Sequence, residues 1–341
     1  MLSLAGWRPV MKAATTIGVG GRRAALSAGL RALLGFRTLA VVTALATYAL
    51  IVLGGTVRAT DSGTACPDWP LCHGQVIPPL ETHVMIEYSH RLVASVVGFL
   101  ILGTVFWAWR RERESKLVFR AGITTVALLA GQVGLGGVTV KTETAASVVA
   151  LHLTMALALF SIMIVIAVRA LSESAHRVRV GPSGGVMELS RAIGGARLAA
   201  LAGTFALIIV GAYVSQTGAG LAYPDWPLFD GKLVSAGGRL ADLHYAHRLL
   251  AAVVGLLLLA LAIETWKRER GSVAMAAVAV AWALYVAQVI VGASNIWLDL
   301  ATSVRIVHLA LASALWGVLV FAVMWSYLAT KTAPGEGVQG A

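Results

Sequence analysis

The sequence predicts an all-α polytopic membrane protein whose eight transmembrane helices form two pseudo-symmetric parallel four-helix bundles, with both termini cytoplasmic. Three observations lead to this fold class. First, 58% of the residues are hydrophobic and only 13% are charged, with a mean hydropathy of +0.81. Such a composition excludes an ordinary soluble domain. Second, the chain contains eight long apolar runs, and third, one sequence pattern occurs twice.

Each apolar run is about 20 residues long, the length that a helix needs to cross roughly 30 Å of hydrocarbon. The runs are continuously apolar, whereas the strands of a membrane barrel would be short and alternating. We therefore expect helices at 37–57, 88–109, 118–140, 147–169, 197–215, 245–266, 272–294 and 303–328.

The basic residues predict the orientation of these helices. Of the 27 Lys and Arg residues, 20 fall in segments 1–37, 110–120, 169–197, 267–270 and the C-terminal tail, which share one side of the membrane. Because cytoplasmic segments carry the excess of positive charge, both termini are expected in the cytoplasm. The same bias explains the net charge of +11. It indicates contact with anionic lipid head groups and requires no nucleic-acid partner.

Residues 1–36 are basic and contain no acidic residue. A mitochondrial transit peptide has a similar composition. We favour a bacterial cytoplasmic segment, and hence a multi-pass protein of the bacterial cell membrane, with the mitochondrial inner membrane as the alternative. We find no cleavable secretory signal, and cleavage of 1–36 stays open.

Two halves follow from the order of the helices. Four helices per half return the chain to the side on which it started, so the halves insert in the same direction and are related by an axis along the membrane normal. The predicted units are an N-terminal bundle at 37–171, a cytoplasmic linker at 172–196, a C-terminal bundle at 197–328 and a cytoplasmic tail at 329–341.

The repeated pattern lies in the loops and helices near the outer face. Residues 60–74 read TDSGTACPDWPLCHG and residues 217–231 read TGAGLAYPDWPLFDG, at an offset of 217 − 60 = 157. His90 and His247 share that offset, because 247 − 90 = 157, and His152 and His308 differ by 308 − 152 = 156. Four histidines thus occupy equivalent positions in the two halves.

Paired histidines at one depth of a helical bundle point to a bound group. Ionisable residues within membrane helices are rare and usually functional. Two imidazoles facing each other across a bundle are a common way to ligate a haem iron, whereas zinc prefers four tetrahedral ligands that include thiolates or carboxylates. We therefore predict one haem iron between each pair. The remaining histidines lie in loops or at a helix edge, and the surface interpretation is preferred for His73, His83 and His176.

Other polar residues near the histidines allow two interpretations. Arg91 and Arg248 follow the candidate ligands directly, and each either pairs with haem propionates or extends to the lipid head groups. Gln132 and Gln288 either bond to a neighbouring helix or contribute to the site. Small residues nearby are interpreted as positions of close helix packing: Gly131, Gly134, Gly136, Gly137 and Gly292.

Several motifs in the right order resemble the haem A synthase family, in its bacterial form with a cysteine pair. They are CPDWPLC, EYSHR at 87–91, YAHR at 245–248, and HL at 152–153 and 308–309. The resemblance implies oxidation of the methyl substituent of haem O to a formyl group, giving haem A for terminal oxidases. It also implies that His247 and His308 hold a haem b cofactor, that His90 and His152 hold the substrate haem O, and that Glu87 is the functional glutamate.

Glu87 has no acidic counterpart, because His244 occupies its position in the second half. On a helix, Glu87 and His90 share a face. A carboxylate there can accept a proton or stabilise a developing cation. The alternative is an acid at a helix N-terminus, favoured by the helix dipole. We prefer the catalytic interpretation, which makes the first half the reacting half.

Cys66 and Cys72 are the only cysteines, and they lie in an outer loop where a disulfide is expected. The disulfide either holds the loop or takes part in turnover, and Tyr223 and Phe229 replace it in the second half. The Asp-Trp-Pro sequence is present in both loops and is interpreted as turn structure and interfacial anchoring.

Two other functions remain as alternatives. A two-haem cytochrome b would pass electrons without changing haem, but it would not need Glu87 or the cysteine pair. A transporter with parallel repeats would need broken helices and polar residues near the midplane. The expected partners are the farnesyltransferase that makes haem O (haem O synthase) and an unidentified electron acceptor or donor. A homo-oligomer is compatible with the sequence.

Overall fold

The computed structural model describes residues 35–113, 116–172, 194–235 and 237–330. Over these residues the chain forms eight long helices and one short 3-10 turn, and all eight helices are long and apolar enough to cross a membrane. The predicted all-α polytopic fold and its eight spans are confirmed. The helices are α2 (Phe36–Ala59), α3 (Thr82–Arg111), α4 (Lys116–Lys141), α5 (Ala146–Ser172), α7 (Gly195–Gln216), α8 (Arg239–Arg268), α9 (Val273–Trp297) and α10 (Thr302–Thr330), and the turn is η1 (Ala219–Leu221).

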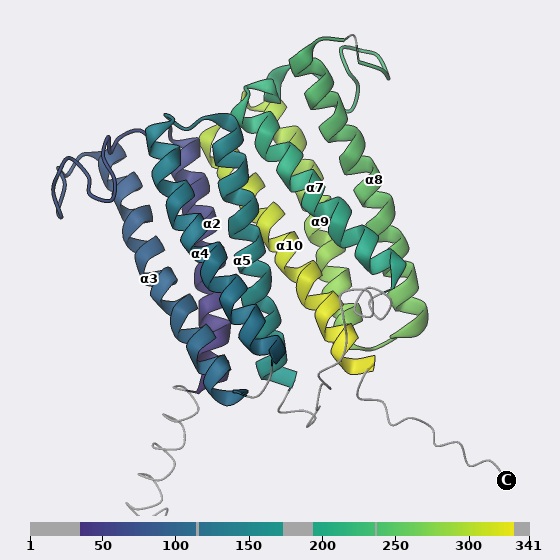
Figure 1. Ribbon diagram of the computed structural model, residues 1–341. Helices are drawn as coiled ribbons and strands as arrows, with labels where there is room; N and C mark the ends of the chain where they lie inside the picture. Colours follow the sequence, from purple (N-terminus) through teal and green to yellow (C-terminus); the bar gives the residue numbers. More distant parts are fainter. Residues whose placement is uncertain (1–34, 114–115, 173–193, 236, 331–341) are drawn as a thin grey trace, which may run out of the picture.

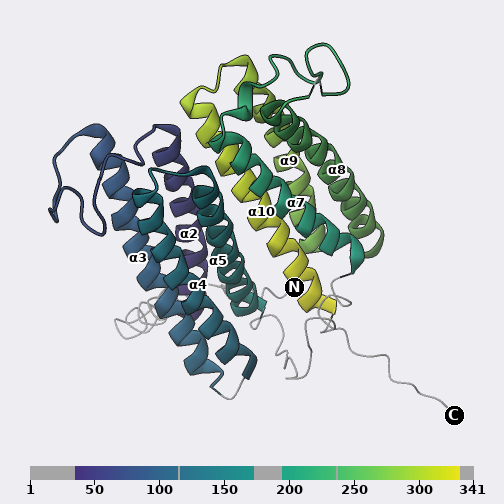
Figure 2. The same ribbon diagram turned by 45° about the horizontal axis from the view of Figure 1, so that its top comes forward.

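The helices form two groups that lie side by side, α2–α5 and α7–α10 (Figure 1). The α2–α3 loop (60–81) and the α7–α8 loop (217–238) lie at the same end of the molecule, and the turned view agrees (Figure 2). The pseudo-twofold relation, the domain limits and the cytoplasmic termini stay predictions. Residues 1–34 and 331–341, and 173–193 of the predicted linker, lie outside the described part.

Helices α3 and α8 begin earlier than the apolar runs indicated. The differences are 88 − 82 = 6 and 245 − 239 = 6 residues. Both helices continue beyond the apolar segment into polar turns, which an apolar run cannot reveal. Glu87 therefore lies five residues past the start of α3 at Thr82, and the first turn of α3 contains no acid. The interpretation of Glu87 as an N-terminal acid is wrong, because the effect of the dipole is confined to that turn.

Helix α10 joins the two groups into one core. Trp316 and Val320 pack with buried residues of α2, α3 and α5, while Leu315 and Leu319 pack with those of α7, α8 and α9. Half of the α10 span is buried inside the protein, against a third or less in every other span. Opposite faces of one helix therefore serve both halves, and the halves share their packing.

Polar bonds and one close approach strengthen this junction. The Trp316 indole N–H donates to Ser161 Oγ at 2.9 Å, and the Tyr48 hydroxyl donates to the Ala310 carbonyl at 3.2 Å. A Cβ on Gly317 would lie 2.8 Å from Phe160 Cζ, so this position on α10 admits only glycine without a shift of the ring. The absence of a side chain on Gly317 brings α10 against α5.

The Gly317→Ala variant should destabilise the protein by about 1–3 kcal/mol, because the added methyl group overpacks the junction. The measurement is the thermal unfolding midpoint in detergent. Gly103→Ala is the matched control, since its Cβ would meet nothing within 4 Å. That control should be neutral or slightly stabilising, by up to about 1 kcal/mol of helix propensity. Equal midpoints for both variants would contradict the shared core.

Candidate functional site

Both loops are built around the aspartate of the Asp-Trp-Pro sequence. Asp68 accepts the N–H groups of His73 at 2.6 Å and Gly74 at 2.8 Å. Asp225 accepts those of Asp230 and Gly231 at 2.8 and 2.9 Å. The Trp–Pro peptide that follows is cis in both loops. The interpretation of this sequence as turn structure is confirmed.

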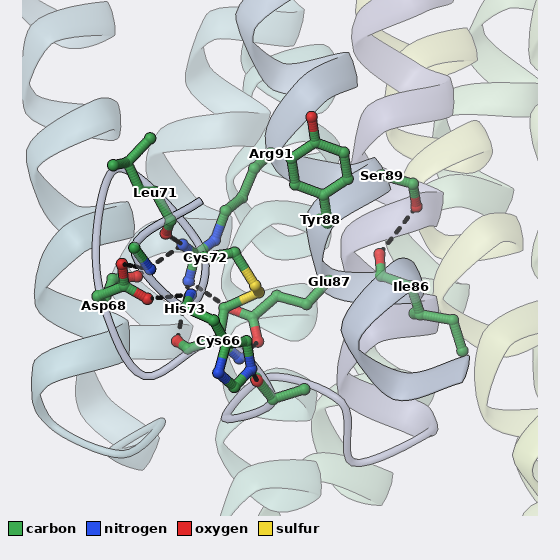
Figure 3. The surroundings of a disulfide bond; sticks show 12 residues. Cys66, Asp68, Leu71, Cys72, His73, Ile86, Glu87, Tyr88, Ser89 and Arg91 are labelled. Atoms are coloured by element: carbon green, nitrogen blue, oxygen red, sulfur yellow. Dashed lines mark hydrogen bonds and ion pairs between the residues drawn. A yellow bond between two sulfur atoms is a disulfide. The ribbon is translucent and has the colours of Figure 1, made fainter. Parts of the chain in front are cut away.

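In the α2–α3 loop, the predicted disulfide joins Cys66 to Cys72. Both cysteines are fully buried and pack against Val84, with Tyr88 beside them (Figure 3). The Tyr88 hydroxyl also donates to the Val76 carbonyl at 2.7 Å. The disulfide and these contacts hold the loop against the first turns of α3.

The Glu87 carboxylate lies between α3 and this loop, with 4% of the residue exposed. One carboxylate oxygen accepts the backbone N–H of Cys66 at 2.8 Å, and the other pairs with Arg91 Nη2 at 2.5 Å (Figure 3). The candidate acid Glu87 is thus hydrogen-bonded to the backbone of Cys66, one of the two cysteines of the disulfide. This connection gives the disulfide a defined structural effect: it holds a donor of the carboxylate in place.

Arg91 connects the same helix to the loop backbone. Its Nη1 donates to the carbonyl oxygens of Asp68, at 2.7 Å, and Leu71, and its Nη2 donates to the Cys66 carbonyl at 3.1 Å. Sequence reasoning missed this role, because backbone carbonyls leave no trace in a side-chain pattern. The predicted contact between Arg91 and a propionate stays a prediction.

The second half keeps one of these contacts, since Arg248 Nη1 donates to the Leu228 carbonyl at 2.8 Å as Arg91 Nη1 does to the Leu71 carbonyl, and it replaces the ion pair and the disulfide. His244 is buried rather than at an exposed helix edge, with 5% of the residue accessible, and its Nε2 accepts a hydrogen bond from Arg248 Nε at 3.0 Å. Tyr223 and Phe229 take the positions of the cysteines and meet edge to face, with ring centroids 5.1 Å apart. The Arg248 guanidinium lies over both rings, at 5.7 and 5.1 Å. An aromatic pair and a cation therefore replace the disulfide and the ion pair.

Each candidate histidine pair comes from the second and fourth helices of its half. His90 and His152 lie on α3 and α5, and His247 and His308 lie on α8 and α10. Among the described residues, no group of three or more His, Cys, Asp or Glu side chains could hold a metal ion. The assignment of these histidines as two ligand pairs stays a prediction.

The two glutamines contact this arrangement directly. Gln132 Nε2 donates to His152 Nε2 at 3.1 Å, and Gln288 Nε2 donates to His308 Nε2 at 3.2 Å. The predicted bond to a neighbouring helix is confirmed, and the contribution of the glutamines to a site stays a prediction. Within the described residues, the Nδ1 atoms of His152, His247 and His308 are buried without a hydrogen-bond partner.

Two of the remaining histidines lie at the surface, as expected. His73 and His83 are exposed, and their rings bond to the Ala65 carbonyl and the Ser62 hydroxyl. His176 lies outside the described residues.

The family model for COX15-CtaA, described as cytochrome oxidase assembly protein, matches residues 37–320. The chain belongs to this family. Curated relatives named haem A synthase include those of Shouchella clausii, 32% identical over 297 residues (85% of this chain and 96% of the relative), and Alkalihalophilus pseudofirmus, 29% identical over 289 residues (83% and 95%). A third, from Symbiobacterium thermophilum, is 29% identical over 287 residues (83% and 91%). The family resemblance drawn from the motifs is confirmed.

In this COX15-CtaA member, removing Arg91 should leave Glu87 as a buried charge without its cation. Arg91→Ala should cost about 3–5 kcal/mol of stability, as expected for one broken partner of a buried pair. A second variant that also carries Glu87→Gln should recover part of the loss, because its buried side chain is neutral. Arg248→Ala is the matched control, and it should cost less because its partner is a histidine. Thermal unfolding in detergent measures all three, and equal losses with and without Glu87→Gln would refute the charge explanation.

Acidification should loosen both loops together. The N–H donors of Gly74, and then of His73, hold the pKa of Asp68 below its ordinary value of 3.8, and those of Gly231 and Asp230 do the same for the pKa of Asp225. Since the folded-state pKa is depressed, the stabilisation is complete above pH 3.8 and is lost as the pH falls through the folded value.

Amide hydrogen exchange of residues 66–74 and 223–231, followed as the pH is lowered past 3.8, measures this effect. The rates must first be corrected for the intrinsic effect of pH. Asp68→Asn should abolish the pH dependence in the first loop and preserve it in the second. A pH response that survives in both loops would contradict the assignment.

Proposed function

We propose that this chain oxidises the methyl substituent of haem O to a formyl group and so produces haem A, while its second half carries a haem b cofactor. One observation carries the proposal. Both halves contain the histidine pair and the loop, but only the first contains a buried carboxylate bonded to a disulfide residue. The names of the relatives support the same activity.

The residues of each half fit a haem iron. Two imidazoles from α3 and α5, or from α8 and α10, would supply the nitrogen ligands, and the Nδ1 of His247 is buried without a partner among the described residues. In His152 and His308 the glutamine amide would turn so that its Oε1, which is buried without a partner among the described residues, accepts from Nε2 and leaves Nδ1 for the iron. We assign haem O to His90 and His152 and haem b to His247 and His308. When bound, haem b supplies one-electron redox chemistry.

Arg248 is better placed than Arg91 to donate a hydrogen bond to a haem propionate. Arg248 Nη2 is buried and has no hydrogen-bond partner among the described residues, so it can donate to a propionate of the second-half haem. Both Nη groups of Arg91 already donate, to the loop carbonyls and to Glu87. A propionate contact by Arg91 would therefore have to share or replace one of these bonds.

Glu87 is the residue that we assign to the reaction. Oxidising a methyl group to a formyl group removes electrons and protons and adds one oxygen atom. Each Glu87 oxygen accepts one hydrogen bond, and a carboxylate has further lone pairs with which to accept a proton or stabilise a developing cation. The Cys66 N–H and the Arg91 guanidinium fix its orientation without occupying that capacity.

The remaining assignments concern the surroundings of the enzyme. His247 and His308 would hold the haem that supplies one-electron redox chemistry, an unidentified partner would accept or donate the electrons, and the farnesyltransferase that makes haem O supplies the substrate. The relatives are bacterial, which supports placement in a bacterial cell membrane. A two-haem cytochrome b is not favoured, because it gives no reason for a carboxylate and a disulfide in one half only.

Glu87→Gln should abolish the chemistry and preserve haem binding. We expect the yield of haem A to fall by about 100-fold to 10,000-fold, the usual contribution of a positioned acid or base. The experiment expresses the protein with a supply of haem O, extracts the haems and separates haem O from haem A. Normal haem A production by this variant would sink the assignment of Glu87.

The ligand variants allocate the two haems. His247→Ala or His308→Ala should lose haem b, because one axial ligand is missing, whereas His90→Ala should keep haem b and fail to convert haem O. Absorption spectra and haem extraction of the purified variants measure both outcomes. Retention of haem b in His247→Ala together with its loss in His90→Ala would reverse the assignment.

A further inference from the structure

Every candidate ligand histidine lies against a glycine on the helix that precedes it in the chain. The pairs are Gly54 on α2 with His90 on α3, Gly136 on α4 with His152 on α5, Gly211 on α7 with His247 on α8, and Gly292 on α9 with His308 on α10. Gly136 and Gly292 were interpreted from the sequence only as positions of helix packing. Their nearest neighbour is an imidazole ring.

The glycines repeat with the same offsets as the histidines. The differences are 211 − 54 = 157 and 292 − 136 = 156. The contact is not a general consequence of the many glycines in these helices. A Cβ on Gly98, Gly103 or Gly134 would meet nothing within 4 Å. A glycine beside each histidine is therefore a property that both halves share.

The four contacts differ in tightness. A Cβ on Gly211 would lie 2.8 Å from His247 Cε1, closer than real Cβ contacts, so the ring would have to move. The corresponding distances are 3.1 Å at Gly54 and 3.2 Å at Gly292, where the ring would have to give slightly, and 3.7 Å at Gly136, an ordinary contact. A methyl group at Gly211 should therefore disturb its histidine most, and one at Gly136 least.

A second difference points to the same position. The helix that presents the glycine to His152 or His308 also presents a glutamine to the same ring. In each case the glutamine lies four residues before the glycine and on the same helix face, as Gln132 does before Gly136 and Gln288 before Gly292. His247 has no such glutamine, because Leu207 stands four residues before Gly211, and its Nδ1, like those of His152 and His308, is buried with no hydrogen-bond partner among the described residues. The orientation of that ring thus depends on packing, and the Gly211 backbone forms one wall of its pocket.

We propose that these four glycines are positioning residues that set the orientation of the axial imidazoles, and that Gly211 has the strongest effect, on the haem of the second half. The inference rests on the proposed function, because it takes the histidines as haem ligands. It goes beyond that function because it assigns the orientation of each imidazole ring to a glycine on a neighbouring helix. Ring orientation governs the ligand field of the iron, so a displaced ring changes the spectrum of the haem and not only its occupancy.

The test compares Gly211→Ala, Gly292→Ala and Gly134→Ala in full-length protein purified in detergent. All three are made in a His90→Ala background, which breaks the first-half pair so that the spectra report the second half. The readouts are the g values of the low-spin ferric haem, the absorption spectrum and the haem-to-protein ratio. We expect shifted g values or lost haem in Gly211→Ala, a smaller shift in Gly292→Ala, and parental values in Gly134→Ala.

Other outcomes separate the glycine inference from the proposed function. Parental g values in Gly211→Ala would overturn the inference, even if its thermal stability fell, because a merely structural role lowers stability without moving the spectrum. If Gly211→Ala does not fold, Gly292→Ala decides the matter by the same criterion. If His247→Ala retains its haem, the ligand assignment itself is wrong. If His247→Ala loses haem and both glycine variants keep the parental spectrum, the proposed function stands and this inference falls.

Discussion

Hydrocarbon tolerates no unpaired backbone groups and few unpaired polar side chains, and this constraint organises the whole chain. Helices satisfy the backbone, so the loops that hold the special chemistry are confined to the helix ends. Polar side chains inside the bundles must find partners on neighbouring helices. The Trp316 bond to Ser161 and the Gln132 bond to His152 are two results. One serves the junction between the halves, and the other orients a candidate ligand.

Arg91 and Arg248 occupy equivalent positions, but they contact different side chains in the two halves. Both arginines donate to loop carbonyls, but Arg91 also pairs with a carboxylate, whereas Arg248 bonds to a histidine and lies over two aromatic rings. Charge decides the difference. A buried carboxylate needs a cation and N–H donors, whereas the neutral His244 imidazole accepts one hydrogen bond from Arg248 and leaves Arg248 Nη2 without a partner among the described residues. Replacing Glu87 by His244 therefore changes what the neighbouring arginine can do.

The spans of the fold were predictable from the sequence, because the hydrocarbon that each apolar run crosses sets its length, and the loop features were predictable from residue patterns. The eight spans, the disulfide and the turn role of Asp68 and Asp225 followed from such patterns. The early starts of α3 and α8 did not, since polar helical turns resemble loops. The contacts of Arg91 and the burial of His244 were missed because they depend on tertiary packing. The glycine beside each histidine had a visible signal, namely its repeat at offsets of 157 and 156.

The repeat also separates the features that both halves share from those that occur once. Whatever both halves need is retained twice: the histidine pair, the glycine beside each ring, the glutamine and the aspartate turn. Whatever only one half needs occurs once: Glu87 and the disulfide bonded to it. Because Cys66 contributes both a sulfur to the disulfide and an N–H to the carboxylate, these two unique features act as one unit. In the second half, the aspartate turn, the Arg248 bond to the Leu228 carbonyl and the aromatic packing around Arg248 hold the corresponding loop.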